Sequence, residues 1–181
     1  VWVMTGSTGA LGAVQRFLAS FERIPRLAFV YAQHMDARQE SNLEVLARAN
    51  PGFHCTLALG RHWLNPGQLL VVPASSQLGF TRQGEVFSTR QPWPGPETPC
   101  IDDLLLAISG IRPAGAIAWS GAGRDGCRGL ACLASLGTAV WAQDPATCEA
   151  PSMPEAAIAE GFVKLADSPE GLAARLAREY P

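Results

Sequence analysis

The sequence has no excess of positive charge and no long apolar run. Its 181 residues include 14 lysine and arginine residues and 16 aspartate and glutamate residues, so the formal net charge is −2. Proteins that bind nucleic acid or anionic lipid need a clear basic excess, and a membrane-spanning helix needs roughly 18 apolar residues in succession. The first residues also lack the basic segment of a signal peptide. We therefore expect a cytoplasmic protein that binds no nucleic acid and does not insert into a membrane.

Motifs for metal ions are also missing. The chain has five cysteines and three histidines, but they form no C-x-x-C pair and no zinc-ligand spacing. An odd number of cysteines without such a pair is typical of small apolar side chains in a reducing compartment. We therefore expect buried cysteines and no metal site.

Apolar stretches suited to buried parallel strands alternate along the chain with segments of helical periodicity. Strands are predicted at residues 1–5, 27–31, 55–58, 69–72, 115–119, 138–141 and 162–165, and helices at residues 10–21, 38–49 (capped by Asp36), 101–109, 127–136, 155–160 and 169–179. Residues 79–81 and 85–88 predict a small β-hairpin. The alternation predicts an α/β fold, a doubly wound, mostly parallel sheet with helices on both faces. We expect residues 1–181 to form a single domain.

Polar side chains follow several of these predicted strands. Ser7 follows the first strand, Gln33 and His34 follow the second, residues 120–125 follow the strand at 115–119, and residues 143–144 follow the next one. In doubly wound sheets, ligands bind outside the carboxyl ends of strands, near the point where the strand order reverses. We therefore look for the functional site among these residues.

The glycine-rich turn at residues 5–12, TGSTGALG, is compatible with two functions. The spacing of its glycines is that of extended short-chain dehydrogenases, in which the pyrophosphate of NAD(P) lies at the helix N-terminus. Two features count against this cofactor. The second strand ends in Gln33-His34 and not in the acidic residue that binds ribose. The only lysine, Lys164, has Glu160 four positions before it, so the catalytic Tyr-x-x-x-Lys motif of those enzymes is absent.

The alternative is a hydrolase with Ser7 as a nucleophile exposed at a strand end. Ser7, His34 and Asp125 supply a hydroxyl, a base to remove its proton and an acid to orient the base. Backbone N–H groups in the turns at residues 8–9 and 121–123 offer donors for an oxyanion. Each residue also has a structural alternative: Ser7 as a helix N-cap, His34 as a polar residue at a strand end, and Asp125 as a turn acid. We expect structural roles for His54, at a strand start, and His62, in a loop.

Several ordered motifs resemble the catalytic domain of the CheB family of chemotaxis protein-glutamate methylesterases. The resemblance covers nearly the whole chain and preserves the order of the motifs. The segments that carry it are Gly6-Ser7-Thr8-Gly9, Gln33-His34-Met35, Pro66-Gly67 with Val72-Pro73-Ala74, Pro99-Cys100-Ile101-Asp102, the turn Ser120-Gly121-Ala122-Gly123-Arg124-Asp125-Gly126, and Ala142-Gln143-Asp144 with Ser152-Met153-Pro154-Glu155-Ala156-Ala157.

The resemblance implies a Rossmann-like domain and a Ser-His-Asp hydrolase that needs no cofactor. Its implied substrate is a γ-glutamyl methyl ester on a cytoplasmic helix of a chemoreceptor, and some members also deamidate glutamine there. Implied partners are the receptor, an N-terminal receiver domain, which these 181 residues do not contain, and chemosensory array proteins. The implied catalytic residues are Ser7, His34 and Asp125, and those near the oxyanion and substrate are Thr8, Gly9, Ala122 and Gly123.

Some positions depart from the family pattern and identify the chain as a divergent member. Ala122 replaces a methionine of the active-site wall, Ala10 replaces a glycine, Asp36 a proline and Gln77 a histidine, and residues 150–152 replace a Tyr-Gly approach to Met-Pro. The three triad residue types are retained, so these changes bear on substrate choice. Two alternatives remain: a non-catalytic member that binds receptor helices or array proteins, and, with less support from the residues, an NAD(P)-binding protein similar to short-chain dehydrogenases.

Overall fold

The structure is a computed structural model that describes residues 1–35 and 42–181. Within these residues a seven-stranded, fully parallel sheet runs in the order β10-β9-β8-β1-β2-β5-β3, with β1 at its centre. Its strands are β1 (Trp2–Gly6), β2 (Phe29–Gln33), β3 (His54–Leu57), β5 (Gln68–Val71), β8 (Gly115–Ala118), β9 (Ala139–Gln143) and β10 (Leu165–Asp167). The predicted parallel α/β fold is confirmed.

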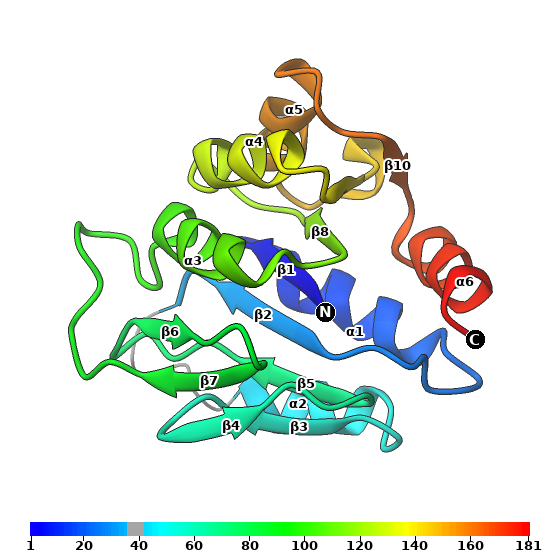
Figure 1. The fold of residues 1–181 in the computed structure, drawn as a ribbon. Helices are drawn as coiled ribbons and strands as arrows, with labels where there is room; N and C mark the ends of the chain where they lie inside the picture. Colours follow the sequence, from blue (N-terminus) through cyan, green and yellow to red (C-terminus); the bar gives the residue numbers. More distant parts are fainter. Residues whose placement is uncertain (36–41) are drawn as a thin grey trace.

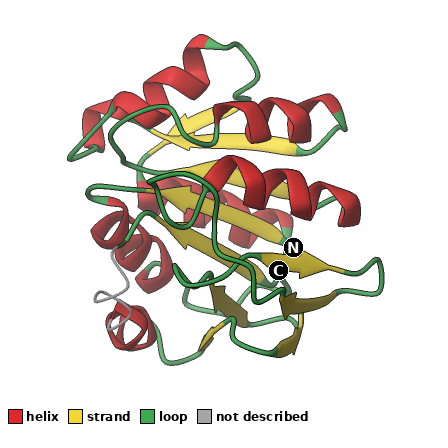
Figure 2. Cartoon of the chain, turned by 90° about the vertical axis from the view of Figure 1, so that its left-hand side faces the viewer, coloured by secondary structure: helices red, strands yellow, loops and turns green. Residues whose placement is uncertain are grey.

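Helices cover both faces of this sheet (Figures 1 and 2). One face carries α1 (Ala10–Ala19), α2 (Asn42–Ala49) and α6 (Pro169–Glu179), and the other carries α3 (Ile101–Ile108), α4 (Cys127–Ser135) and α5 (Ser152–Ala159). Side chains alternate along β1: Trp2 and Met4 belong to the first core and Val3 to the second. A central parallel strand is buried on both faces, which explains why β1 is apolar at each of these positions.

A second, three-stranded antiparallel sheet packs beside α3, in the order β4-β7-β6. The predicted hairpin is confirmed as β6 (Leu78–Phe80) paired with β7 (Glu85–Ser88). The expectation that His62 lies in a loop is wrong, because β4 (Arg61–Trp63) pairs with β7. The three residues of β4 include exposed Arg61 and Trp63, so no apolar alternation marks them as a strand.

Some predicted boundaries also need correction. Strand β10 begins at Leu165 and not at residue 162, because its pairing with β9 begins at Leu165, opposite Trp141. Phe162 and Val163 lie before the strand and pack against the second core. Helix α5 begins three residues earlier than expected, at Ser152. The predicted cap Asp36 lies outside the described residues. The five cysteine side chains are half-buried and not fully buried as expected. Within the described residues, no helix is long and apolar enough to cross a bilayer.

Candidate active site

The sheet reverses its strand order beside β1. The chain passes from β1 to β2 on one side and later returns through β8 to the other side of β1. Gly6 pairs with Gln33 across β1 and β2, so Ser7 and His34 are the first residues beyond two paired strand ends. The turn after β8 reaches the same edge of the sheet. The crevice where such folds place their ligands is therefore bordered by the three segments that the sequence singled out.

The turn that carries Ser7 is held by its backbone. The N–H of Ser7 donates to the Ser120 carbonyl at 2.9 Å, and the N–H of Ala10 donates to the Ser7 carbonyl at 3.1 Å. Gly9, and not Ser7, occupies the N-cap position of α1, and no side chain caps this helix. The N-cap alternative for Ser7 is therefore wrong. Ser7 is half-buried, and no described residue forms a hydrogen bond with its hydroxyl.

Glycine is required at position 9 for two reasons. Its φ is +80°, in the left-handed region that side chains disfavour. A Cβ at this position would also lie 2.6 Å from the Cβ of Glu149 and 2.7 Å from the hydroxyl of Ser120. The glycine thus lets the turn pack directly against the loops that follow β8 and β9. This close packing is a structural reason for the glycine that does not involve a pyrophosphate.

Gln33 fixes the same turn from the other side. Its amide nitrogen donates to the Ser7 carbonyl at 3.3 Å, and its amide oxygen accepts the Tyr31 hydroxyl at 2.6 Å. A dinucleotide enzyme needs a free carboxylate near this strand end to bind ribose hydroxyls. The position instead carries a buried amide that is engaged with the protein itself, which counts further against an NAD(P) site.

His34 and Asp125 form the closest polar contact of the site. Nε2 of His34 lies 2.7 Å from Oδ2 of Asp125, and the two side chains are 10% and 19% exposed. Oδ2 also accepts the Ile101 N–H at 2.8 Å, and Oδ1 accepts the Asp102 N–H at 3.0 Å. Burial alone would raise the pKa of Asp125, but the hydrogen bonds from His34 and the two amides outweigh it and lower the pKa below its usual value. The carboxylate is therefore ionised, and Nε2 of His34 carries the shared proton.

The two amides that hold Asp125 belong to the first turn of α3. Cys100, at the N-cap position of that helix, makes no side-chain capping bond, so Asp125 caps it from a turn 24 residues further along the chain. This role of the Ile101 and Asp102 amides is not evident from the sequence alone. The only available signal was the motif Pro99-Cys100-Ile101-Asp102, which marks a helix start but not its partner.

The other ring nitrogen of His34, Nδ1, has no hydrogen-bond partner among the described residues. Oε2 of Glu97 is the nearest acidic oxygen, at 3.6 Å, beyond hydrogen-bond distance, and its side chain is 64% exposed. The loop that carries Glu97 is fixed next to His34, because the N–H of Met35 donates to the Thr98 carbonyl at 2.8 Å. The structure thus brings His34 and Asp125 into contact and places Ser7 on the neighbouring strand end without a hydrogen bond to the imidazole.

The backbone N–H groups that we predict as oxyanion donors differ in whether they already donate a hydrogen bond within the protein. The backbone N–H groups of Thr8, Gly9 and Ala122 donate to no described atom, whereas the N–H of Gly123 donates to the Ser152 hydroxyl at 3.2 Å. Thr8 and Ala122 are exposed. Three unpaired donors therefore border the crevice from the turns after β1 and β8.

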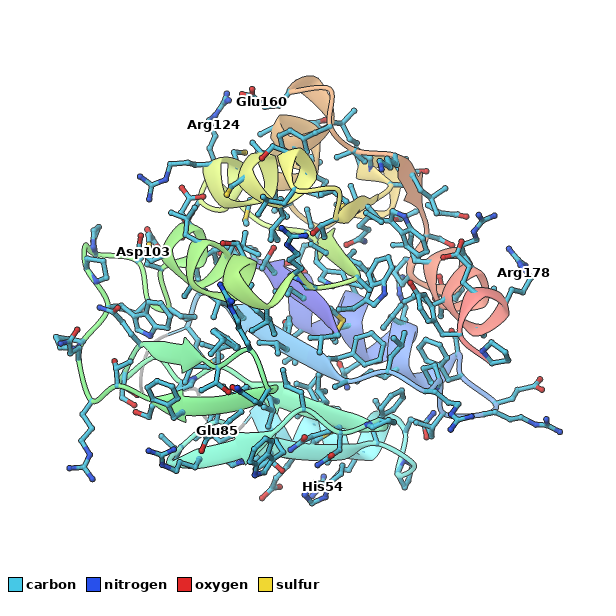
Figure 3. The ribbon with its side chains drawn as sticks, viewed as in Figure 1. His54, Glu85, Asp103, Arg124, Glu160 and Arg178 are labelled. Atoms are coloured by element: carbon cyan, nitrogen blue, oxygen red, sulfur yellow. The ribbon has the colours of Figure 1, made fainter. Side chains whose placement is uncertain are left out.

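Other candidate residues stay apart from this crevice. His54 lies at the opposite end of the molecule from Arg124 (Figure 3), and Nε2 of His62 donates to the Leu59 carbonyl at 2.6 Å. Within the described residues, no group of three or more histidine, cysteine, aspartate or glutamate side chains could hold a metal ion. The candidate residues that lie beyond the ends of β1, β2 and β8 are therefore a hydroxyl, an imidazole–carboxylate pair and backbone amides.

This combination agrees with a family profile, described as CheB methylesterase, that matches residues 2–176. The chain belongs to the CheB methylesterase family. It is 33% identical to protein-glutamate methylesterase/protein-glutamine glutaminase 3 of Anaeromyxobacter dehalogenans, over 98% of this chain and 53% of that protein. It is 32% identical to the protein of the same name from Geobacter sulfurreducens, over 87% of this chain and 44% of that protein. This CheB-family chain spans about half the length of the curated relatives it matches.

The crystal structure of the Thermotoga maritima CheB methylesterase catalytic domain has the same fold. It superposes with a TM-score of 0.89 at 23% identity and covers 98% of this chain and 97% of that one. The family resemblance predicted from the ordered motifs is thus confirmed. The individual roles of Ser7, His34 and Asp125 stay predictions.

Proposed function

We propose that this chain is a methylesterase catalytic domain that hydrolyses γ-glutamyl methyl esters on the cytoplasmic helices of a chemoreceptor. The observation that carries the proposal is the ionised, backbone-anchored Asp125 bonded to His34, beside a free serine hydroxyl on the adjacent strand end. An imidazole held in one tautomer by a carboxylate is what a serine needs to become a nucleophile.

In the proposed reaction, the Ser7 hydroxyl attacks the ester carbonyl while Nδ1 of His34 takes its proton. Asp125 stabilises the resulting imidazolium through Nε2. The unpaired amides near Thr8 and Ala122 stabilise the oxyanion, a contribution of about 3 kcal/mol for one such donor. The imidazolium then protonates the leaving methoxide, and methanol departs from the acyl-enzyme.

The second half of the reaction uses the same groups. A water molecule loses a proton to His34 and attacks the acyl-enzyme, and the products are free glutamate and the restored serine. A γ-glutamyl amide enters the same acyl-enzyme with ammonia as the leaving group, so glutamine deamidation is included in the proposal. The names of the relatives, which combine methylesterase and glutaminase, support this extension.

Partners and domain organisation are also part of the proposal. The receptor's cytoplasmic helices supply the ester, and a receiver domain or array proteins regulate access to it. We propose that residues 1–181 act as a single catalytic domain, which corresponds to about half the length of each of these relatives.

The deciding experiment measures the release of labelled methanol from a methylated receptor cytoplasmic fragment. Wild type is compared with Ser7→Ala and with Ser20→Ala, a matched change at the C-cap of the same helix α1. We expect release by wild type and Ser20→Ala, and none by folded Ser7→Ala although it still binds the fragment. Binding without release by all three proteins would favour the non-catalytic alternative. Equal release by all three would refute Ser7 as the nucleophile.

A further inference from the structure

Ser152 forms a bridge across the turn that follows β8. Its hydroxyl accepts the N–H of Gly123 at 3.2 Å and donates to the carbonyl of Gly121 at 3.1 Å. Ala122 lies between these two residues, is exposed, and has an N–H without a partner among the described residues. The Ser152 hydroxyl thus forms hydrogen bonds with both Gly121 and Gly123, the residues on either side of Ala122, whose amide we propose as an oxyanion donor.

The first half of the turn is well fixed without Ser152. The N–H of Gly121 donates to the Ala150 carbonyl at 2.8 Å, and the N–H of Met153 donates to the Gly121 carbonyl at 3.0 Å. A Cβ on Gly121 would lie 2.1 Å from the Sδ of Met153, so this residue is also tightly packed. Gly121 is therefore held by both hydrogen bonds and close contacts.

The backbone at Gly123 has few contacts of its own, although Asp125, two residues further on, is held by three hydrogen bonds. Gly123 has a φ of +92°, and nothing lies within 4 Å of the position that its Cβ would occupy. A neighbouring link, the ion pair of Arg124 with Glu160 at 2.7 Å, lies at the outer edge of the molecule (Figure 3). Its side chains are 70% and 48% exposed, and such pairs contribute little. Among the described residues, the exposed Ser152 hydroxyl is thus the hydrogen-bond partner of the Gly123 backbone, which is also exposed.

We propose that Ser152 is a positioning residue that keeps the Ala122 amide directed at the oxyanion, an inference that rests on the proposed function. An oxyanion donor is effective only when its direction is set before the reaction.

Loss of the Ser152 hydroxyl should therefore impair the chemical step and not substrate binding. Loss of a whole oxyanion donor costs on the order of 10²–10³-fold in kcat. A donor that is present but less well oriented loses part of this, so we expect Ser152→Ala to lower kcat about 10-fold. KM should stay within about twofold, because the oxyanion bond forms mainly in the transition state.

The test compares Ser152→Ala and Ser152→Thr with Ser168→Ala. Ser168 caps α6, where its hydroxyl accepts the N–H of Gly171 at 3.1 Å. This control removes an equivalent hydroxyl-to-backbone bond away from the crevice. The readouts are kcat and KM for methanol release, and the hydrogen-exchange rate of the Gly123 amide by NMR, which does not depend on activity.

We expect Ser152→Ala to speed exchange at Gly123 and lower kcat, Ser152→Thr to restore both, and Ser168→Ala to change neither. Unchanged exchange at Gly123 in Ser152→Ala would refute the bridge. Faster exchange with unchanged kcat would refute the positioning role but leave the proposed function intact. A folded wild type without turnover would overturn the proposed function and the positioning role together, while the exchange data would still decide the Ser152–Gly123 contact.

Discussion

Replacing Asp125 by asparagine tests how the base of the site is oriented. The carboxylate accepts three hydrogen bonds: from His34 and Ile101 on Oδ2 and from Asp102 on Oδ1. Asparagine keeps the shape of the side chain but has one acceptor oxygen and one donor NH₂ group. At least one of the three donors must therefore face another donor, whichever way the amide is turned.

Each orientation of the amide has a different cost. With the NH₂ group in the Oδ2 position, it faces the N–H of Ile101 and donates to Nε2 of His34. The imidazole must then carry its proton on Nδ1, where it cannot accept the proton of Ser7. With the NH₂ group in the Oδ1 position, the tautomer is kept, but the Asp102 N–H loses its acceptor at a cost of about 1–3 kcal/mol. The negative charge that stabilises the imidazolium is lost in both orientations.

The expected result is a loss of both activity and stability. The equivalent change in a Ser-His-Asp protease lowers kcat about 10⁴-fold, and we expect a loss of similar order in methanol release. Chemical denaturation should show about 1–3 kcal/mol less free energy of unfolding. Asp144→Asn is the matched control, because among the described residues the carboxylate of Asp144 accepts a single N–H, that of Ala146, which an asparagine oxygen can also accept. Methanol release by Asp125→Asn within tenfold of wild type would refute this account of the tautomer.

Two further predictions concern the nucleophile turn and acid stability. Gly9→Ala should lower the free energy of unfolding, measured in urea, more than Gly84→Ala does. Both glycines have a positive φ, which costs a residue with a side chain about 1–2 kcal/mol. Only at position 9 would the new Cβ also come close to other atoms, among them the Cβ of Glu149. Equal losses would show that the contact is unimportant. The lowered pKa of Asp125 stabilises the fold at pH values above the unfolded pKa of about 3.9, and this stability is lost as the pH falls through the lower folded pKa. Denaturation between pH 6 and about 2.5 should therefore show a shallower decline in Asp125→Asn, and parallel curves would contradict the assignment.

Much of the fold can be predicted from this sequence because its elements are locally consistent. Helix α6 has the predicted bounds, and its Ser168 cap, Pro169 at the first position and amphipathic pattern all indicate the same start. Strand β1 is apolar from Trp2 to Met4 because both of its faces are covered. In contrast, β4 forms because β7 provides its hydrogen-bond partner. Its three residues show no strand pattern of their own, so the strand could not be predicted from the sequence.

The candidate site likewise has some contacts that can be predicted from the sequence and others that cannot. The proximity of Ser7 and His34 follows from a rule of parallel sheets, since residues after paired strand ends are neighbours. The amides of Ile101 and Asp102 could not be assigned to Asp125 from the sequence, because the approach of α3 to the turn depends on the packing of α3 against α4. The bridge from Ser152 is hidden for a similar reason. These contacts depend on tertiary distances that no local pattern encodes.

The turn after β8 connects every part of the proposed site. The carbonyl of Ser120 fixes the N–H of Ser7, and the hydroxyl of Ser120 donates to the Thr8 carbonyl at 2.7 Å. Five residues later, Asp125 fixes His34. One short segment of backbone, the turn after β8, thus contacts both the proposed nucleophile turn and the proposed base, and it also carries the amide of Ala122. Groups that act as a unit have non-additive effects on the catalytic rate. A substitution that displaces this turn should therefore remove most of the activity that Ser7→Ala or Asp125→Asn removes on its own.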